Sequence, residues 1–223
     1  PVWSFGGTVP GTEIRVSQGG RVQSQLSNAL PQATAVHWHG IRIDNAMDGV
    51  PGLTQDVIEP GSTFDYDFAV PDAGTYWYHS HNRTIEQVAR GLYGPLIIEE
   101  SDKPDVDRDL TLMLDDWRLD AETAQITDDF DNGHDLSHAG RLGNIVTVNG
   151  QFDPSYKVRA SERLRLRLIN ASNARIFDLG IDGLTGWIVA LDGMPLETPL
   201  EITDRFPLGP AQRADMIVDV RAS

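Results

Sequence analysis

Residues 21–26 read Arg-Val-Gln-Ser-Gln-Leu, and residues 163–168 repeat the pattern as Arg-Leu-Arg-Leu-Arg-Leu. This alternation is typical of β-strands, because successive side chains of a strand point to opposite faces of its sheet. Further along, residues 59–68 resemble residues 209–218 in the same order. Two similar β-domains in tandem are the simplest explanation of this internal repeat.

Other parts of the chain also have the pattern of strands, with short apolar or alternating runs bounded by Gly, Pro, Asn and Asp. Many short strands separated by turn residues predict an all-β fold of sandwich or barrel domains. Residues 84–90 are the only candidate for a short helix in the first half, and the polar, acidic residues 120–135 are expected to form an irregular surface loop. The predicted strands are 13–16, 21–26, 35–43, 63–70, 74–79, 95–99, 110–114, 145–148, 163–170, 187–191 and 215–220.

The repeat divides the chain into a first domain over residues 1–103 and a second over 104–223, joined through the acidic stretch 99–109. After Phe68 the first domain continues through further strands, whereas the sequence ends soon after Val218. A sheet without its last strands exposes edges and core. We therefore expect the second domain to be incomplete at its C-terminal end, and the chain to be part of a longer protein.

Composition excludes several classes of function. The 223 residues include 18 Lys and Arg against 33 Asp and Glu, a net charge of −15, and phosphate binding needs a basic face instead. Nucleic acid is therefore not an expected partner. No apolar run approaches the roughly 20 residues of a membrane-spanning helix. The cysteine count of 0 excludes disulfides, thiol nucleophiles and a blue-copper centre, which needs a Cys thiolate.

Four of the six histidines form two pairs, His37 with His39 and His79 with His81. Residues i and i+2 of a strand share a face, so each pair sets two imidazoles about 7 Å apart along the strand. That spacing suits two metal ions, or one ion and a neighbour, better than one ion held by both rings. A single His-X-His motif usually occurs by chance on a protein surface or in a core. Two such pairs among aromatic residues instead indicate a transition-metal site.

The surroundings of both pairs are equally distinctive. Residues 37–40 read His-Trp-His-Gly, residues 76–81 read Tyr-Trp-Tyr-His-Ser-His, and residues 48–55 read Asp-Gly-Val-Pro-Gly-Leu-Thr-Gln. The first two stretches resemble the first two copper motifs of the multicopper oxidases, the laccases and their relatives, and the third resembles the loop after the first motif. The resemblance implies tandem cupredoxin-like domains, each a Greek-key β-sandwich or barrel.

In that family a blue copper takes single electrons from a substrate, and a trinuclear copper cluster uses them to reduce O2 to water. The resemblance implies that His37 is a type 2 copper ligand, that His39 and His79 serve one type 3 copper, and that His81 serves the other. Asp48 matches an acidic position that delivers protons to the cluster in some relatives. From spacing alone, an Asp in an Asp-Gly turn is an equally good interpretation.

The chain departs from the complete family pattern. It has no Cys for the type 1 blue copper, and Ser80 stands where a version with that copper in the first domain would carry Cys. At the offset of the repeat, His37 and His39 fall on Leu179 and Ile181, so the second domain supplies no ligands. The chain is therefore predicted to be the first two domains of a three-domain enzyme, with half of the trinuclear site.

The expected function is the N-terminal part of a multicopper oxidase, which couples one-electron oxidation of a small-molecule or metal-ion donor to four-electron reduction of O2. We expect this part to be inactive until a missing C-terminal domain supplies the type 1 copper and the remaining histidines. The alternative is a stand-alone, non-catalytic copper-binding protein of the cupredoxin fold. A structural protein of the same fold without copper is less consistent with all four histidines. The family is mostly periplasmic or secreted, which is the localisation expected here.

Three features have weaker interpretations. His134 and His138 would come together in a helix, because they are four residues apart, but a solvated loop is expected and an adventitious metal is the alternative. The basic face of residues 163–168 is expected to be a solvated or interdomain surface. Four aromatic residues near the histidines are expected to pack rather than to react. They are Trp38, Tyr76, Trp77 and Tyr78.

Overall fold

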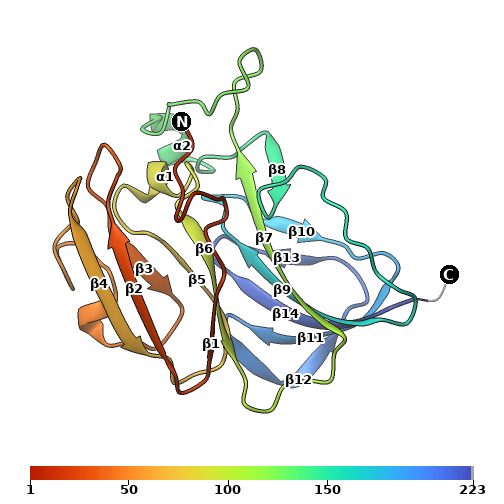
Figure 1. Ribbon diagram of the computed structural model, residues 1–223. Coiled ribbons are helices and arrows are strands. Elements are labelled where there is room, and N and C mark those ends of the chain that lie inside the picture. The colour runs from red at the N-terminus through yellow and green to blue at the C-terminus, as the bar shows by residue number, and fades with distance from the viewer. Residues whose placement is uncertain (222–223) are drawn as a thin grey trace. The chain divides into compact units, whose positions relative to one another are not determined.

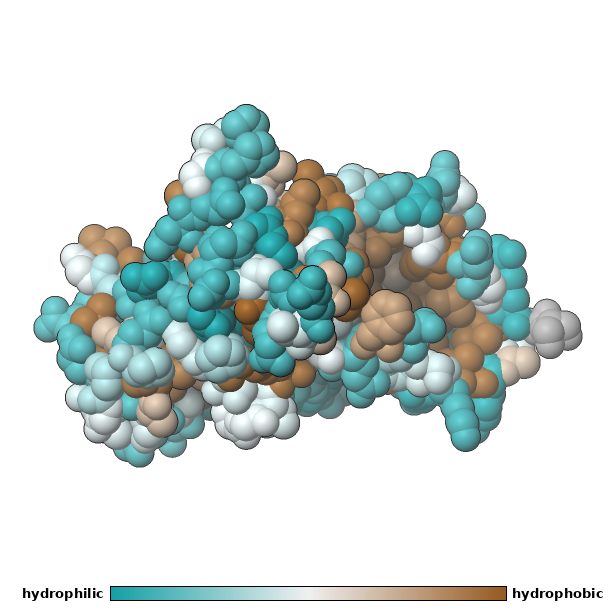
Figure 2. Space-filling view, turned by 90° about the horizontal axis from the view of Figure 1, so that it is seen from above, coloured by the Kyte–Doolittle hydropathy of each residue, from teal (hydrophilic) through white to brown (hydrophobic). Residues whose placement is uncertain are grey.

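The computed structural model describes residues 1–221 and is nearly all β, which confirms the predicted fold class. It forms two compact units, one over Pro1–Ser101 and one from Asp102 onward. Among the described residues, no helix has the length and apolar character needed to cross a membrane. Hydrophilic side chains cover much of the face seen in Figure 2, as expected for a net charge of −15.

Unit 1 contains two sheets (Figure 1), and apolar side chains from both form one core. The larger sheet has the strand order β1-β6-β5-β3, and β2 pairs with β4 in the other. This aromatic core contains Trp38, Tyr66, Phe68, Tyr76 and Tyr78 beside aliphatic residues. The alternation of β4 supplies two of them, because its aspartates are exposed on the other face. The elements are β1 (Ile14–Ser17), β2 (Arg21–Ser27), β3 (Val36–His39), η1 (Asn45–Met47), β4 (Thr63–Ala69), β5 (Gly74–Ser80), α1 (Thr84–Gln87) and β6 (Tyr93–Glu99).

Unit 2 is organised around a six-stranded sheet in the order β12-β11-β14-β9-β7-β8, with β10 and β13 paired separately. Its core includes Leu164, Leu166 and Leu168, the apolar half of the alternating run in β9. The elements are β7 (Arg108–Trp117), α2 (Gly133–Ser137), β8 (Ile145–Val148), β9 (Arg163–Asn170), β10 (Phe177–Leu179), β11 (Leu184–Leu191), β12 (Met194–Glu201), β13 (Phe206–Leu208) and β14 (Arg213–Val220).

The internal repeat of the sequence corresponds to a repeat of strand pairing. In unit 1, β2 and β4 are antiparallel with Val22 opposite Phe68. In unit 2, β9 and β14 are antiparallel with Leu164 opposite Val218, the positions that the repeat aligns with Val22 and Phe68. The two halves therefore share a backbone register as well as a sequence pattern.

Several element boundaries differ from the predictions. The strand expected over 35–43 ends at His39, because Gly40 has a φ of +88° and turns the chain. The predicted helix at 84–90 is limited to α1. The strands β10, β12 and β13 are absent from the predicted set. In β12, Pro195 and Pro199 hide the strand pattern, but they are tolerated because β12 lies at the edge of its sheet.

The acidic segment contains a helix, so the prediction of an irregular loop over 120–135 is wrong in its last residues. The helix α2 begins after Asn132, whose side-chain oxygen accepts hydrogen bonds from the backbone N–H groups of His134 (2.9 Å) and Asp135 (3.3 Å). Asn is a favoured residue at this capping position, because it satisfies N–H groups that have no partner inside the helix.

The basic alternation in β9 does not form a solvated face, so that part of the expectation is wrong. The side chain of Arg167 is 1% exposed and contacts two carboxylates, Asp109 at 2.8 Å and Asp215 at 3.3 Å. Arg165 is also buried and lies 2.6 Å from Asp215. Arg163 is the one exposed arginine of the three in β9, and it pairs with Asp219. Buried charges require such partners, because an unpaired charge inside a protein is strongly destabilising.

The substitution Asp215→Asn tests the buried ion pairs. It removes the charge shared by Arg165 and Arg167, and we expect a loss of about 3–5 kcal/mol in the free energy of unfolding, measured in urea. The matched control is Asp178→Asn, because Asp178 pairs with Arg205 while its own side chain is 63% exposed. The control should cost no more than about 1 kcal/mol. Equal losses in the two variants would contradict the assignment.

Candidate metal centre

The four paired histidines lie on two neighbouring strands of unit 1, β3 and β5. These strands are antiparallel, with His37 opposite His79 and His39 opposite Trp77. Because side chains alternate, Trp38 and Tyr78 point into the aromatic core while the histidines occupy the other face. His81 follows directly after β5, and its backbone N–H donates to the carbonyl oxygen of Ala35.

His37 is the centre of the group of rings. Its ring centroid lies 5.6 Å from that of His39, 5.4 Å from that of His79 and 5.2 Å from that of His81. The rings of His39 and His79 are 5.4 Å apart. The pairing of the strands thus brings together all four histidines that the sequence singled out, and contacts between strands are as close as contacts within a motif.

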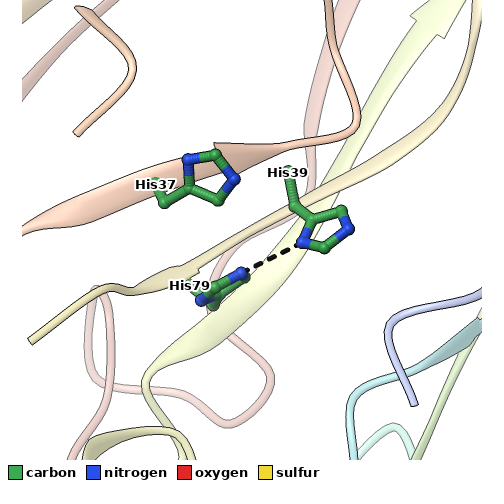
Figure 3. Close-up of side chains that lie close together, drawn as sticks. All are labelled: His37, His39 and His79. Carbon is green, nitrogen blue, oxygen red and sulfur yellow. Dashed lines mark hydrogen bonds between the residues drawn. The ribbon is translucent and has the colours of Figure 1, made fainter. Parts of the chain in front are cut away.

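Three of these histidines have the spacing of ligands around a metal ion. Ligand nitrogens of His37, His39 and His79 all lie within 4.8 Å of one another. The closest pair is His39 Nδ1 and His79 Nε2, 3.2 Å apart and turned toward each other in Figure 3. Two nitrogens that each bond a metal at about 2.0–2.1 Å in tetrahedral geometry have nearly this separation. The donor set therefore fits a transition-metal ion.

Burial keeps part of this group neutral. It lowers the pKa of His79 to about 3, against the smaller opposing effect of the hydrogen bond to the Ser80 carbonyl. Burial also lowers the pKa of His81, and the neighbouring His37 acts in the same direction. Metal ions bind the neutral imidazole, so desolvation prepares these side chains as ligands.

Backbone carbonyl groups orient two of the rings. His37 Nδ1 lies 2.8 Å from the carbonyl oxygen of Asp48, and His79 Nδ1 lies 2.8 Å from that of Ser80. A carbonyl oxygen can only accept, so each Nδ1 carries the proton, and in the neutral ring Nε2 keeps its lone pair for a metal. The carboxylate of Asp48 lies farther from His37 Nδ1, at 3.4 Å.

The position of Asp48 depends on the glycine that follows it. Gly49 has a φ of +78°, and a Cβ added there would lie 1.7 Å from the carbonyl oxygen of Val36 in β3. Only glycine allows the loop to approach the strand so closely. The Asp-Gly turn is therefore what places Asp48 beside His37.

Trp77 is a site residue that the sequence interpretation missed. Trp38, Tyr76 and Tyr78 belong to the aromatic core, as expected. Trp77 instead lies on the histidine face, with its ring 4.3 Å from that of His79 and 5.2 Å from that of His39. The signal was present in the sequence, because Trp77 precedes His79 by two residues and therefore shares its face.

Ser80, where a blue-copper version of this domain would carry Cys, points away from the histidine face. It is fully buried, and its hydroxyl donates a hydrogen bond to the side-chain oxygen of Gln87. The same hydroxyl lies 3.3 Å from the hydroxyl of Thr34. Its neighbours are therefore polar groups that position the turn into α1.

Two family models describe the chain, and both carry the description multicopper oxidase. One matches residues 1–103 and the other matches residues 108–223. Together they account for nearly all of the sequence.

Relatives and solved structures give the same result. Copper resistance protein A of Pseudomonas syringae pv. tomato is 34% identical over 98% of this chain and 42% of its own length. Laccase-1 of Botryotinia fuckeliana is 35% identical over 100% of this chain and 40% of its own. The structure of a multi-copper oxidase from Pseudomonas thermotolerans superposes with a TM-score of 0.95 at 38% identity, covering 100% of this chain and 54% of that one. The chain thus spans about half the length of the proteins it matches.

The substitution Gly49→Ala tests the role of the close approach to β3. We expect the clash with Val36 to displace the loop, to break the hydrogen bond from His37 Nδ1 to Asp48, and to cost more than about 2 kcal/mol of unfolding free energy. Urea unfolding and the imidazole nitrogen NMR signals of His37 measure the two effects.

Gly52→Ala is the matched control for this substitution. Gly52 lies in the same loop with a φ of +76°, but a Cβ there would meet nothing within 4 Å. It carries only the backbone strain, about 1–2 kcal/mol. His37 signals that move equally in both variants would refute the role assigned to Gly49.

Proposed function

The chain belongs to the multicopper oxidase family, and on that basis we propose that it supplies half of the trinuclear copper site of a laccase-like oxidase. The observation that carries the proposal is the face shared by four histidines, with His39 Nδ1 and His79 Nε2 3.2 Å apart. When bound there, copper would supply the one-electron chemistry by which O2 is reduced to water. The residues of this chain hold and orient the metal.

We assign His37 to the type 2 copper, His39 and His79 to one type 3 copper, and His81 to the other. The short separation of the facing nitrogens of His39 and His79 supports their sharing an ion. The central position of His37 supports a separate role, since its ring lies at similar distances from the other three. The carbonyl groups that accept from His37 and His79 keep these rings in place before and after metal binding.

Asp48 has two parts to its proposed role. Its carbonyl oxygen orients His37, and its carboxylate, 3.4 Å from the same ring, is the proposed source of protons for reduced oxygen. The side chain is 28% exposed, so it can exchange protons with solvent while it faces the site. The substitution Asp48→Asn keeps the backbone carbonyl group that orients His37 and removes the side-chain acid. It therefore separates the two proposed roles.

The remaining parts of the enzyme lie outside these residues in this proposal. A C-terminal domain would carry the type 1 copper and the other histidine ligands, in keeping with relatives about twice as long. The partners would be that domain, O2 and a small-molecule or metal-ion electron donor, in the periplasm or outside the cell. The second candidate is a stand-alone copper-binding protein. It is favoured by His37, His39 and His79, which have the spacing of a metal site without any ligand from another domain.

Oxygen consumption and copper content together test this function. We expect residues 1–223 alone to bind copper weakly and to show no O2 reduction with a phenolic or metal-ion donor, because half of the ligands are absent. The protein with its C-terminal part should consume O2. In that protein, His39→Ala with His79→Ala should lower the rate by more than about a hundredfold.

The matched control substitutes both members of an exposed ion pair of unit 2, Asp178→Ala with Arg205→Ala, and should leave the rate and the copper content unchanged. Copper bound by the longer protein without any O2 consumption would favour the stand-alone binding protein. O2 reduction by residues 1–223 alone would contradict the division of the site between two parts.

A further inference from the structure

A second pair of histidines lies in unit 2 at the short helix α2, where His134 belongs to the helix and His138 caps its C-terminal end. We propose that His134 and His138 form a binding site for a divalent transition-metal cation, Cu2+ foremost and Ni2+ or Zn2+ with lower affinity, separate from the four histidines of unit 1. The pair comes together because residues i and i+4 are neighbours on a helix surface. Their ring centroids are 4.2 Å apart and the rings are stacked, with planes within 6° of parallel, so one ring has to turn out of the stack before both can bind one ion in their own planes.

The hydrogen bonds of His138 prepare it as a ligand. Its Nδ1 lies 3.1 Å from the backbone carbonyl oxygen of His134 and 2.9 Å from the hydroxyl of Ser137. The carbonyl oxygen can only accept, so Nδ1 carries the proton and Nε2 keeps its lone pair in the neutral ring. This is the arrangement that orients metal-binding histidines generally, with one nitrogen on a backbone carbonyl and the other on the metal.

The helix is held by ion pairs, so the two rings stand on a fixed support. Arg118 contacts Asp135 of α2 at 2.6 Å and Asp129 at 3.0 Å. Arg141 contacts Asp129 at 2.7 Å, and its guanidinium lies 4.3 Å from the ring centroid of Phe130. A metal that binds both rings therefore meets a helix already formed.

Exposure and charge favour a hydrated cation as the occupant. Both histidines are exposed, as are Asp128 and Asp131 close by in the sequence. Because its side chain is exposed, His134 can turn out of the stack and direct its Nε2 at an ion bound by His138 without opening the fold, and water completes the coordination. Imidazole suits Cu, Ni and Zn, and Cu2+ binds most tightly among the first-row divalent ions at a given nitrogen site.

Retention on immobilised Ni2+ measures the site in the untagged protein as isolated. We expect the wild-type protein to be retained by chelation, whereas His134→Gln should elute at a concentration of imidazole about tenfold lower. This variant leaves the backbone carbonyl of residue 134 in place, so the hydrogen bond that orients His138 survives. Retention equal to that of the wild type would overturn the proposal.

A second variant controls for the number of histidines. His138→Ala combined with Ala139→His keeps the count but moves one imidazole off the shared face, so retention should fall as in His134→Gln. Retention like that of the wild type in this variant would also overturn the site, by showing that histidine count alone decides binding.

Hydrogen exchange provides a readout that does not depend on the resin. Adding ZnCl2 should slow exchange of the α2 amide protons in the wild-type protein and leave both variants unchanged. Only a zinc ion bound by both rings would link the two ends of the helical turn and so stabilise the helix. Slowing of the same size in the variants, or none in the wild type, would count against chelation by this pair.

Discussion

The register between β3 and β5 is the constraint on which the histidine cluster depends, because it sets His37 opposite His79. A slip of one residue would turn the histidines of one strand into the core and expose Trp38 or Tyr78. The ring of Trp38 packs against Tyr66 at 5.4 Å and against Phe68 at 4.8 Å, and those contacts would be lost. The aromatic core therefore stabilises the arrangement of the polar face on the other side of the sheet.

The two units share one strand-pairing register but not the chemistry of the histidine cluster. The repeat preserves a pairing register, as Val22 with Phe68 and Leu164 with Val218 show. At the positions aligned with His37 and His39, unit 2 has Leu179 and Ile181, which pack against its own core. The aligned positions thus carry imidazoles in one unit and apolar side chains in the other.

The sequence predicted what local alternation determines and missed what distant residues determine. Alternation was enough to put both members of each His-X-His pair on one face. It could not predict that His39 would lie nearest to His79, since that depends on how two strands pair. Likewise, Arg167 is buried only because Asp109 and Asp215 neutralise it from other strands. The helix α2 needed both its Asn132 cap and the ion pair with Arg118, which a local pattern of acidic residues does not reveal.

Burial distinguishes the two groups of histidines more than residue type does. Desolvation around His79 lowers its pKa to about 3, so its ring is neutral and shielded from water. The rings of His37 and His79 are also oriented by carbonyl groups, the arrangement that typically holds a metal-binding histidine in place. His134 and His138 share the carbonyl-oriented geometry but lie in solvent. The same side chain is therefore shielded in one unit and open to solvent in the other, and the difference arises from the protein around the ring.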